Sequence, residues 1–145
     1  MNDLNITKYE FPCIVDKKEQ GVLRVFESED VPFTIKRVFS VVNAEGGSKR
    51  GQHSHKICNQ LICCVAGEVN LRCDDGNTQI EILLTPSNEA VLVPCGIWAV
   101  QDYIQDNSVI IVFCDQPYDE NDYMRVYDEY LEWKNKDKNV EKDNH

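Results

Sequence analysis

The chain is organised around one stretch, Gly47-Ser-Lys-Arg50-Gly-Gln-His53-Ser-His55-Lys-Ile-Cys-Asn-Gln60, which holds two of its three histidines. Residues two apart on a β-strand point to the same face, so the imidazoles of His53 and His55 would share one space. Arg50 precedes them in a glycine-containing segment where an anion could dock. An apolar run from Leu61 to Ala66 follows, and a glycine closes it. These features indicate a strand with candidate functional side chains inside a β-rich domain.

Short alternating runs of apolar and polar residues extend on both sides of this stretch. Turn-forming sequences such as Asp74-Asp75-Gly76 and Pro94-Cys-Gly96 separate them. Beside the histidine strand, we expect strands over residues 11–15, 22–27, 33–43, 61–66, 69–73, 79–84, 89–93, 97–100 and 108–114. Many short strands with turns at close intervals predict an all-β barrel or sandwich.

The two ends of the chain differ from this pattern. After Pro117, apolar residues such as Met124, Tyr127 and Leu131 fall at helical spacing behind an acidic start, which predicts one helix over residues 120–133. From residue 134 the chain is charged and lacks apolar anchors, so we expect 134–145 to be a disordered tail. Residues 1–10 are polar and predict a short N-terminal arm, which leaves 11–133 as one folded domain.

The composition limits the classes of function. A formal net charge of −10 argues against nucleic acid as the main partner, because binding to a phosphate backbone needs a positive surface. No apolar run reaches the roughly 18 residues that a membrane-spanning helix needs, and the first residues lack the basic and apolar regions of a signal peptide. The seven cysteines include no CxxC pair, and most lie in apolar runs. We therefore expect reduced, buried thiols in a cytoplasmic protein.

The spacing of the central motif resembles that of the cupins, which are jelly-roll barrels. The first cupin motif comprises Gly47, His53, His55, Gln60 and Gly67, and the second comprises Pro94, Gly96, Trp98 and Ala99. Metal-binding cupins have glutamate at the position of Gln60 and histidine at that of Ala99. A neutral amide and a methyl group make a poor set of ligands for a divalent ion, so the resemblance implies a cupin without metal.

A more specific resemblance covers residues 11–133 and points to the sugar 3,4-ketoisomerases. It rests on Lys36-Arg37-Val-Phe, Arg50-Gly-x-His53-x-His55, Gln60, Asp74-Asp75-Gly76, Pro94-x-x-x-Trp98 and Tyr118-Asp-Glu-x-Asp-Tyr123-x-Arg125-x-Tyr127-Asp128. The resemblance implies an all-β cupin jelly-roll barrel with one C-terminal helix, assembled as a homodimer. It also implies an isomerase without cofactor that acts on thymidine-diphosphate-4-keto-6-deoxyglucose, for the biosynthesis of dideoxy-aminosugar nucleotides and of lipopolysaccharide.

The chemistry of this reaction matches the histidine pair. Moving a carbonyl from C4 to C3 removes the C3 proton, passes through an enediol and returns a proton at C4. Neutral histidine can act as a base near neutral pH and can carry a proton between two oxygens. By the resemblance, His53 is the base at C3, and His55 moves the proton between the C3 and C4 oxygens.

The same resemblance gives further candidates for substrate binding. Arg50 would hold the diphosphate through charge-assisted hydrogen bonds, and Arg37 would contact the same anion or the sugar. Trp98 would form a wall of the pocket, and Gln60 would orient a histidine. The remaining three positions depart from the family, which commonly has Tyr at Ser40, His or Arg at Ala99, and Arg or Tyr at Gln20.

Other interpretations of the same residues stay open at this stage. The histidines could be a structural pair in a half-buried cup, Arg37 a structural arginine and Trp98 plain core. The loss of larger side chains at Ser40 and Ala99 is compatible with a nucleotide-sugar-binding cupin that has no catalytic activity. A divergent metal-binding cupin is the third hypothesis, although Gln60 and Ala99 argue against it.

Overall fold

The structure is a computed structural model of the chain and describes residues 4–18, 21–87 and 89–143. The described residues form mostly β-strands and one long α-helix. The elements are β1 (Thr7–Glu10), β2 (Cys13–Asp16), β3 (Gly21–Arg24), β4 (Arg37–Ala44), β5 (Lys49–His55), β6 (Gln60–Ala66), β7 (Val69–Asp74), β8 (Gln79–Leu84), β9 (Glu89–Val93), β10 (Trp98–Tyr103), β11 (Ser108–Cys114), β12 (Tyr123–Met124) and α1 (Tyr127–Asp143), with 3-10 turns at Ser28–Asp30 and Glu120–Asp122.

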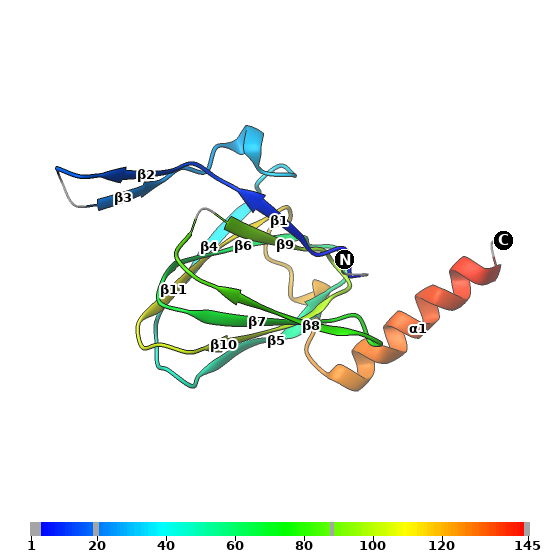
Figure 1. Cartoon of the computed structure of the whole chain (residues 1–145). Coiled ribbons are helices and arrows are strands. Elements are labelled where there is room, and N and C mark those ends of the chain that lie inside the picture. The colour runs from blue at the N-terminus through cyan, green and yellow to red at the C-terminus, as the bar shows by residue number, and fades with distance from the viewer. Residues whose placement is uncertain (1–3, 19–20, 88, 144–145) are drawn as a thin grey trace.

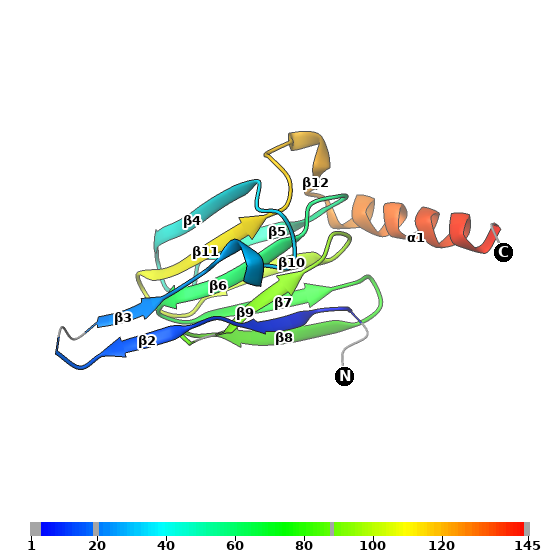
Figure 2. The same cartoon turned by 90° about the horizontal axis from the view of Figure 1, so that it is seen from above.

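Two five-stranded antiparallel sheets lie face to face, and α1 leaves them at one end (Figure 1; Figure 2). The first sheet has the strand order β1-β9-β6-β11-β4, and the second has the order β12-β5-β10-β7-β8. Strands β2 and β3 form a separate hairpin. The predicted all-β architecture with one C-terminal helix is therefore confirmed.

The main hydrophobic core fills the space between the two sheets and includes Ile62 and Cys64 of β6. Strand β6 also buries its other face, because Leu61 and Cys63 pack beneath the N-terminal segment in a second cluster. This double burial explains why β6 is a continuous apolar run rather than an alternating one. All seven cysteines are free thiols and five of them are buried, in agreement with the predicted reduced thiols.

The N-terminal segment is part of the barrel, whereas the sequence predicted a free arm. Residues 7–10 form β1 and pair with β9, and Leu4 and Ile6 are buried in the main core. The edge of β9 offers unpaired backbone groups that this segment satisfies. Two isolated apolar residues in a polar stretch give no local signal of that pairing.

The C-terminal helix begins and ends later than predicted. Residues 120–124 form a 3-10 turn and the short strand β12, so that α1 starts at Tyr127. It then runs to Asp143, and the prediction of a disordered tail is wrong for residues 134–143. Lysines and acidic residues three apart, Lys134 with Asp137 and Lys138 with Glu141, stabilise an exposed helix even without apolar anchors. In the part of the chain that the structure describes, no helix is long and apolar enough to span a membrane.

A β-bulge in β5 decides which of its side chains face the space between the sheets. Ala99 of β10 pairs with His53, but the next residue, Val100, pairs with Gly51, so that Gln52 is the extra residue. Gln52 and Gly51 both have positive φ angles, 54° and 80°. A Cβ at Gly51 would lie 2.9 Å from the carbonyl oxygen of Ala99, which restricts this position to glycine.

The bulge places Arg50 on the same face of β5 as the two histidines. In a regular strand, Arg50 and His53 would point to opposite faces because they are three residues apart. The extra residue shifts the register so that Arg50 pairs with Gln101, whose buried side chain faces the interior and accepts from the Tyr103 hydroxyl at 3.0 Å. A bulge next to a reactive side chain is a common device for re-aiming it.

The first part of helix α1 packs on the barrel, and its last part is exposed. One substitution and one truncation measure what each part contributes to the free energy of unfolding. Tyr130 is fully buried, and its hydroxyl donates to the carbonyl oxygens of Asp74 and Gly96. We expect Tyr130→Ala to lower the free energy of unfolding by about 3–5 kcal/mol. Residues 135–143 are exposed, so removing them should change it by less than about 0.5 kcal/mol. Urea denaturation measures both values, and equal losses would contradict this division.

Candidate active site

His53 and His55 lie side by side on the inner face of β5, as the sequence predicted. Their ring centroids are 4.9 Å apart, and the two rings meet edge to face at 87°. His53 lies opposite Ala99 of β10, and His55 lies opposite Tyr123 of β12. His55 is buried, whereas His53 is only partly buried. The first imidazole therefore lies in the core, and the second lies closer to solvent.

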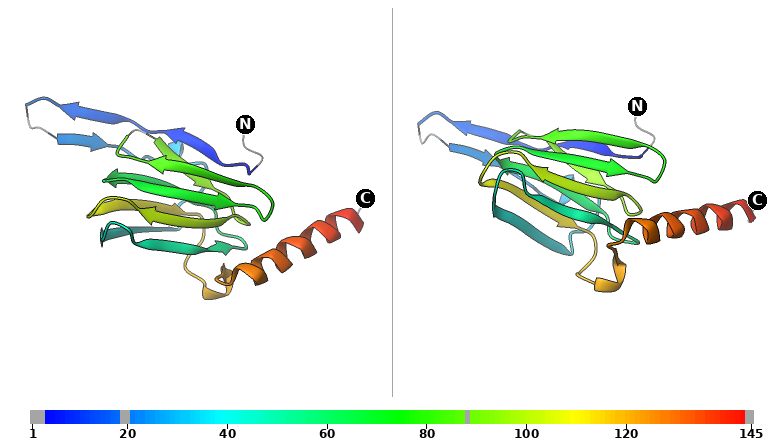
Figure 3. Two further views of the ribbon diagram at one scale, coloured as in Figure 1. Left: turned by 60° about the horizontal axis from the view of Figure 1, so that its bottom comes forward. Right: turned by 90° about the horizontal axis from the view of Figure 1, so that it is seen from below.

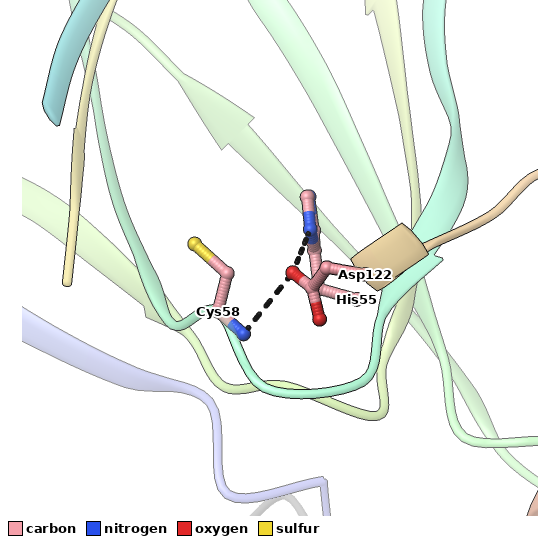
Figure 4. A group of neighbouring side chains, drawn as sticks. All are labelled: His55, Cys58 and Asp122. Carbon is pink, nitrogen blue, oxygen red and sulfur yellow. Dashed lines mark hydrogen bonds and ion pairs between the residues drawn. The ribbon is translucent and has the colours of Figure 1, made fainter. Parts of the chain in front are cut away.

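His55 is held by a buried carboxylate from a distant part of the chain. Its Nδ1 lies 2.9 Å from the Oδ2 of Asp122, which belongs to the 3-10 turn before β12 (Figure 4). Asp122 also accepts the backbone N–H groups of Ile57 at 2.7 Å and Cys58 at 3.3 Å. Burial tends to raise the pKa of Asp122, but the Ile57 N–H and His55 outweigh it, so the pKa lies below its usual range. Asp122 is therefore a carboxylate that fixes the His55 ring.

The bond to Asp122 decides which nitrogen of His55 is available. Because a carboxylate only accepts, Nδ1 carries the proton and Nε2 carries the lone pair of the neutral ring. Nε2 is buried and has no hydrogen-bond partner among the described residues. Burial lowers the pKa of His55, although the hydrogen bond and charge of Asp122 act in the opposite direction. The result is a neutral base with an unoccupied acceptor atom.

His53 has the same tautomer for a different reason. Its Nδ1 donates to the carbonyl oxygen of Gly51 at 2.9 Å, which leaves the lone pair on Nε2. Burial lowers the pKa of His53 to about 4, against the effect of the Gly51 bond, and the charges of His55, Arg125 and Arg37 lower it further. His53 is therefore neutral at physiological pH and can accept a proton.

Tyr123, which the sequence analysis placed inside the predicted helix, lies against both histidines. Its ring centroid lies 4.4 Å from that of His55 and 5.0 Å from that of His53. The guanidinium of Arg125 lies over the Tyr123 ring at 4.3 Å and forms two hydrogen bonds with Glu120. The motif from Tyr118 to Asp128 contains these residues, but its spacing gives no indication that they meet the histidines.

The first sheet contributes a row of three polar side chains from adjacent strands. Arg37, Cys114 and Gln60 are aligned in register on β4, β11 and β6. The Sγ of Cys114 accepts from Arg37 at 3.6 Å and from Gln60 at 3.7 Å. Arg37 also contacts the hydroxyl of Tyr123 at 3.5 Å, which connects this row to the histidines. The sequence analysis expected buried thiols without naming Cys114, and it missed this polar role.

The three side chains in Figure 4 include donor types that bind metals. One ligand atom each from His55, Cys58 and Asp122 lies within 4.8 Å of the others. However, the Asp122 oxygens already accept three hydrogen bonds from protein groups. At the position of a cupin metal ligand, Gln60 donates its amide to Cys114 instead. This donor set orients a histidine and is a poor fit to a divalent ion.

Two predicted binding residues do not face the histidines. Trp98 precedes Ala99 on β10 and therefore points to the outer face, where its ring packs against Tyr127 and Tyr130 of α1. Ser40 is exposed on the outer face of β4, because its neighbours Phe39 and Val41 face inward and pack against the main core. Neither is a wall of the histidine site, and both corrections follow from strand alternation.

The other predicted residues have different positions. Arg50 is exposed at the edge of the inner face, where a ligand from solvent would reach it first. Ala99 is partly buried opposite His53, with a methyl group where the resemblance leads one to expect a longer side chain. Gln20 lies outside the described residues.

Comparison with known proteins agrees with this geometry. The family model "FdtA: WxcM-like, C-terminal" matches residues 4–135. A TDP-4-oxo-6-deoxy-alpha-D-glucose-3,4-oxoisomerase from Aneurinibacillus thermoaerophilus is 32% identical over 123 residues, which are 85% of this chain and 88% of the relative.

Solved structures give the same result for the fold. The sugar 3,4-ketoisomerase QdtA from Thermoanaerobacterium thermosaccharolyticum, in complex with TDP, matches with a TM-score of 0.86 and 30% identity over 93% of this chain and 98% of QdtA. The TDP-fucose-3,4-ketoisomerase WlaRA from Campylobacter jejuni matches with a TM-score of 0.80 and 26% identity, over 90% of this chain and 96% of WlaRA. The chain is therefore an isomerase that belongs to the FdtA, WxcM-like C-terminal family.

Proposed function

We propose that this chain is a sugar 3,4-ketoisomerase that converts thymidine-diphosphate-4-keto-6-deoxyglucose into its 3-keto isomer. The observation that carries the proposal is the pair of neutral imidazoles, His53 and His55. Each donates its Nδ1 proton to a protein acceptor and keeps the lone pair of Nε2 for a substrate. The relative from Aneurinibacillus thermoaerophilus is named for this substrate, and the QdtA structure holds TDP.

The reaction exchanges oxidation states within one molecule. A base removes the proton from C3, and the electrons of that C–H bond form the double bond of an enediolate. A proton then adds to C4, the O3 hydroxyl loses its proton and O4 gains one, so that C3 becomes the carbonyl carbon. The protein must supply only groups that accept and return protons near neutral pH.

The environments of the two histidines support a division of these tasks. Taking a proton from carbon leaves an imidazolium ion, and the carboxylate of Asp122 stabilises that ion at His55. His53 has only a carbonyl partner, which suits a group that moves a proton between two oxygens. We therefore assign proton removal at C3 to His55 and proton transfer between O3 and O4 to His53, the reverse of the assignment implied by the resemblance.

Four residues complete the proposed binding site. Arg50 holds the diphosphate at the edge of the inner face, where charge-assisted hydrogen bonds to phosphate are accessible from solvent. Arg37 and Gln60 line the first sheet and face the sugar. Ala99, opposite His53, leaves room beside the imidazole for a substituent of the sugar ring.

A homodimer is part of the proposal. The hairpin of β2 and β3 extends from the barrel at the end opposite to α1 (Figure 1; Figure 3). A two-stranded hairpin alone is marginally stable in water. This hairpin exposes four apolar side chains, Ile14, Val15, Val22 and Leu23, each more than half accessible. Packing against a second copy of the chain removes these apolar side chains from water and stabilises the hairpin.

A 3-keto sugar nucleotide is a substrate for amination at C3, which places this isomerase before an aminotransferase. The proposed context is therefore the synthesis of dideoxy-aminosugar nucleotides for lipopolysaccharide. Seven free thiols fit a reducing compartment and support the cytoplasm as the location.

Removal of either imidazole tests the function. We expect His55→Asn and His53→Asn each to lower the isomerisation rate by about 10²- to 10⁴-fold, because each removes a group that accepts a proton. Proton NMR of thymidine-diphosphate-4-keto-6-deoxyglucose in D₂O follows the loss of the C3 proton and the appearance of the 3-keto product.

The same experiment separates the two histidines. His55→Asn should abolish exchange of the C3 proton, whereas His53→Asn should keep some exchange while product formation fails. Binding of TDP by both variants, measured by calorimetry, controls for folding. Wild-type protein that binds the nucleotide sugar without C3 exchange would favour the alternative, a nucleotide-sugar-binding cupin without catalytic activity.

The pH dependence follows from the low pKa of His53. A base with a pKa of about 4 stays neutral through the range in which an exposed histidine, with a pKa of about 6.5, becomes protonated. Product formation per unit time should therefore remain level from pH 8 to below pH 6. The free energy of unfolding should meanwhile fall below pH 6.5, because protonation of His53 favours the unfolded state. A rate that halves near pH 6.5 in protein that circular dichroism shows to be folded would contradict a buried neutral His53.

Substitution in the hairpin tests the dimer. We expect light scattering to give twice the chain mass for the wild type and a monomer for the double variant Val15→Lys and Val22→Lys, because two buried charges oppose association. Val140→Lys on the exposed face of α1 is the matched control and should remain a dimer. A monomeric wild type at micromolar concentration would refute this part of the proposal.

A further inference from the structure

Within the residues that the structure describes, Arg37 is a cation without a carboxylate partner beside the histidine pair. Its guanidinium contacts the Sγ of Cys114 at 3.6 Å and the Tyr123 hydroxyl at 3.5 Å. Its Nε is buried and has no hydrogen-bond partner among the described residues. No carboxylate in the described part of the chain forms an ion pair with it. A partly buried guanidinium with an unpartnered Nε and no carboxylate beside it favours an anionic ligand at that atom.

The contacts of Arg37 nevertheless keep it charged. Burial opposes the charge, but the bonds to Cys114 and Tyr123 leave the pKa of Arg37 above its ordinary value. The charge also reaches the histidines, since it lowers the pKa of both His53 and His55. Tyr123 spans the same region, because its hydroxyl meets Arg37 while its ring contacts both imidazoles.

The proposed reaction creates a negative charge that the histidines do not neutralise. When a neutral imidazole takes the C3 proton, the electron pair of the C–H bond delocalises onto the carbonyl oxygen, O4, and an enediolate forms. In a partly desolvated site, a preorganised cation near that oxygen stabilises the transition state more than it stabilises the neutral ketone. Asp122, the nearest carboxylate to His55, would destabilise the same charge.

The other arginines near the site are less suited to this role. Arg125 is exposed, and two hydrogen bonds to Glu120 neutralise its charge. Arg50 is exposed at the edge of the inner face, which suits the diphosphate. Arg37 lies on the inner face in register with Cys114, and its Nε has no hydrogen-bond partner among the described residues.

We propose that Arg37, held by Cys114 and Tyr123, is a catalytic residue that stabilises the enediolate oxygen when the C3 proton leaves. The inference rests on the proposed ketoisomerase function and adds the electrostatic partner that the histidine pair requires. Cys114 is then a positioning residue, because its sulfur accepts from Arg37 and directs the rest of the guanidinium toward the substrate.

The test compares neutral and charged substitutions of Arg37. We expect Arg37→Met to lower kcat by about 10²- to 10³-fold while the Kd for TDP, which lacks the sugar, changes by less than about threefold. Arg37→Lys keeps the charge and should lose less activity than Arg37→Met. The matched control is Arg72→Met, which removes an arginine paired with Asp102 on the outer face of the second sheet and should leave kcat unchanged.

A second readout does not depend on turnover. Removing the positive charge of Arg37 should raise the pKa of His53, which nitrogen-15 NMR titration of the imidazoles measures directly. The acid limb of the kcat/KM profile should move to higher pH in the same variant. The remaining charged or titratable groups facing the two imidazoles in the described part of the chain, all unchanged in the variant, are Arg125, Glu120, Tyr123, Asp122 and Cys58. If Arg37→Met fails to fold, Arg37→Gln, which keeps a hydrogen-bond donor, replaces it.

The outcomes separate this inference from the function on which it rests. An active wild type with Arg37→Met at full kcat, or with equal losses in kcat and TDP affinity, would overturn the role of Arg37 alone. An unchanged His53 pKa in the neutral variant would also overturn it. A wild type without turnover would overturn the ketoisomerase function and the inference together.

Discussion

The hydrogen bond between the Nδ1 of His55 and the carboxylate of Asp122 is the constraint on which the rest of the site depends. The same carboxylate accepts the backbone N–H groups of Ile57 and Cys58, so one buried charge fixes both the histidine ring and the turn that follows it. A buried carboxylate is costly without such donors, which drives the segment around residue 122 against β5. That closure pairs β12 with β5 and sets the ring of Tyr123 against both imidazoles.

In the second sheet, alternate side chains face either the histidines or the helix α1. On β10, Ala99 faces the histidines, whereas Trp98 faces outward and packs against the first turn of α1. The hydroxyl of Tyr127 donates to Asp74 at 2.7 Å on this outer face, so α1 is fixed by aromatic packing and polar contacts together. Because α1 follows β12 directly, this anchor also holds Tyr123 in place beside the histidines.

Local charge near the histidines differs from the charge of the whole protein. The chain carries a formal net charge of −10, yet Arg37 and Arg125 both act on the imidazoles. Their effect adds to that of burial and keeps the histidine pair neutral, which a proton acceptor requires. Glu120 balances Arg125, whereas Arg37 has no carboxylate partner among the described residues. An anionic ligand or intermediate is therefore favoured at the site of an acidic protein.

The sequence by itself determined the class of fold, the family and the shared face of His53 and His55. These depend on local spacing, and residues two apart on a strand share a face whatever surrounds them. Only the tertiary structure decided which other side chains join them. Asp122 is 67 residues from His55 and meets it only when β12 closes, and the inward face of Arg50 depends on a bulge at Gly51 that only the pairing of β5 with β10 defines. Trp98 and Ser40, chosen by motif position, face outward because one residue along a strand reverses the side chain. The N-terminal strand β1 likewise forms because β9 has an open edge with which it can pair. The residues of β1 themselves do not reveal that edge.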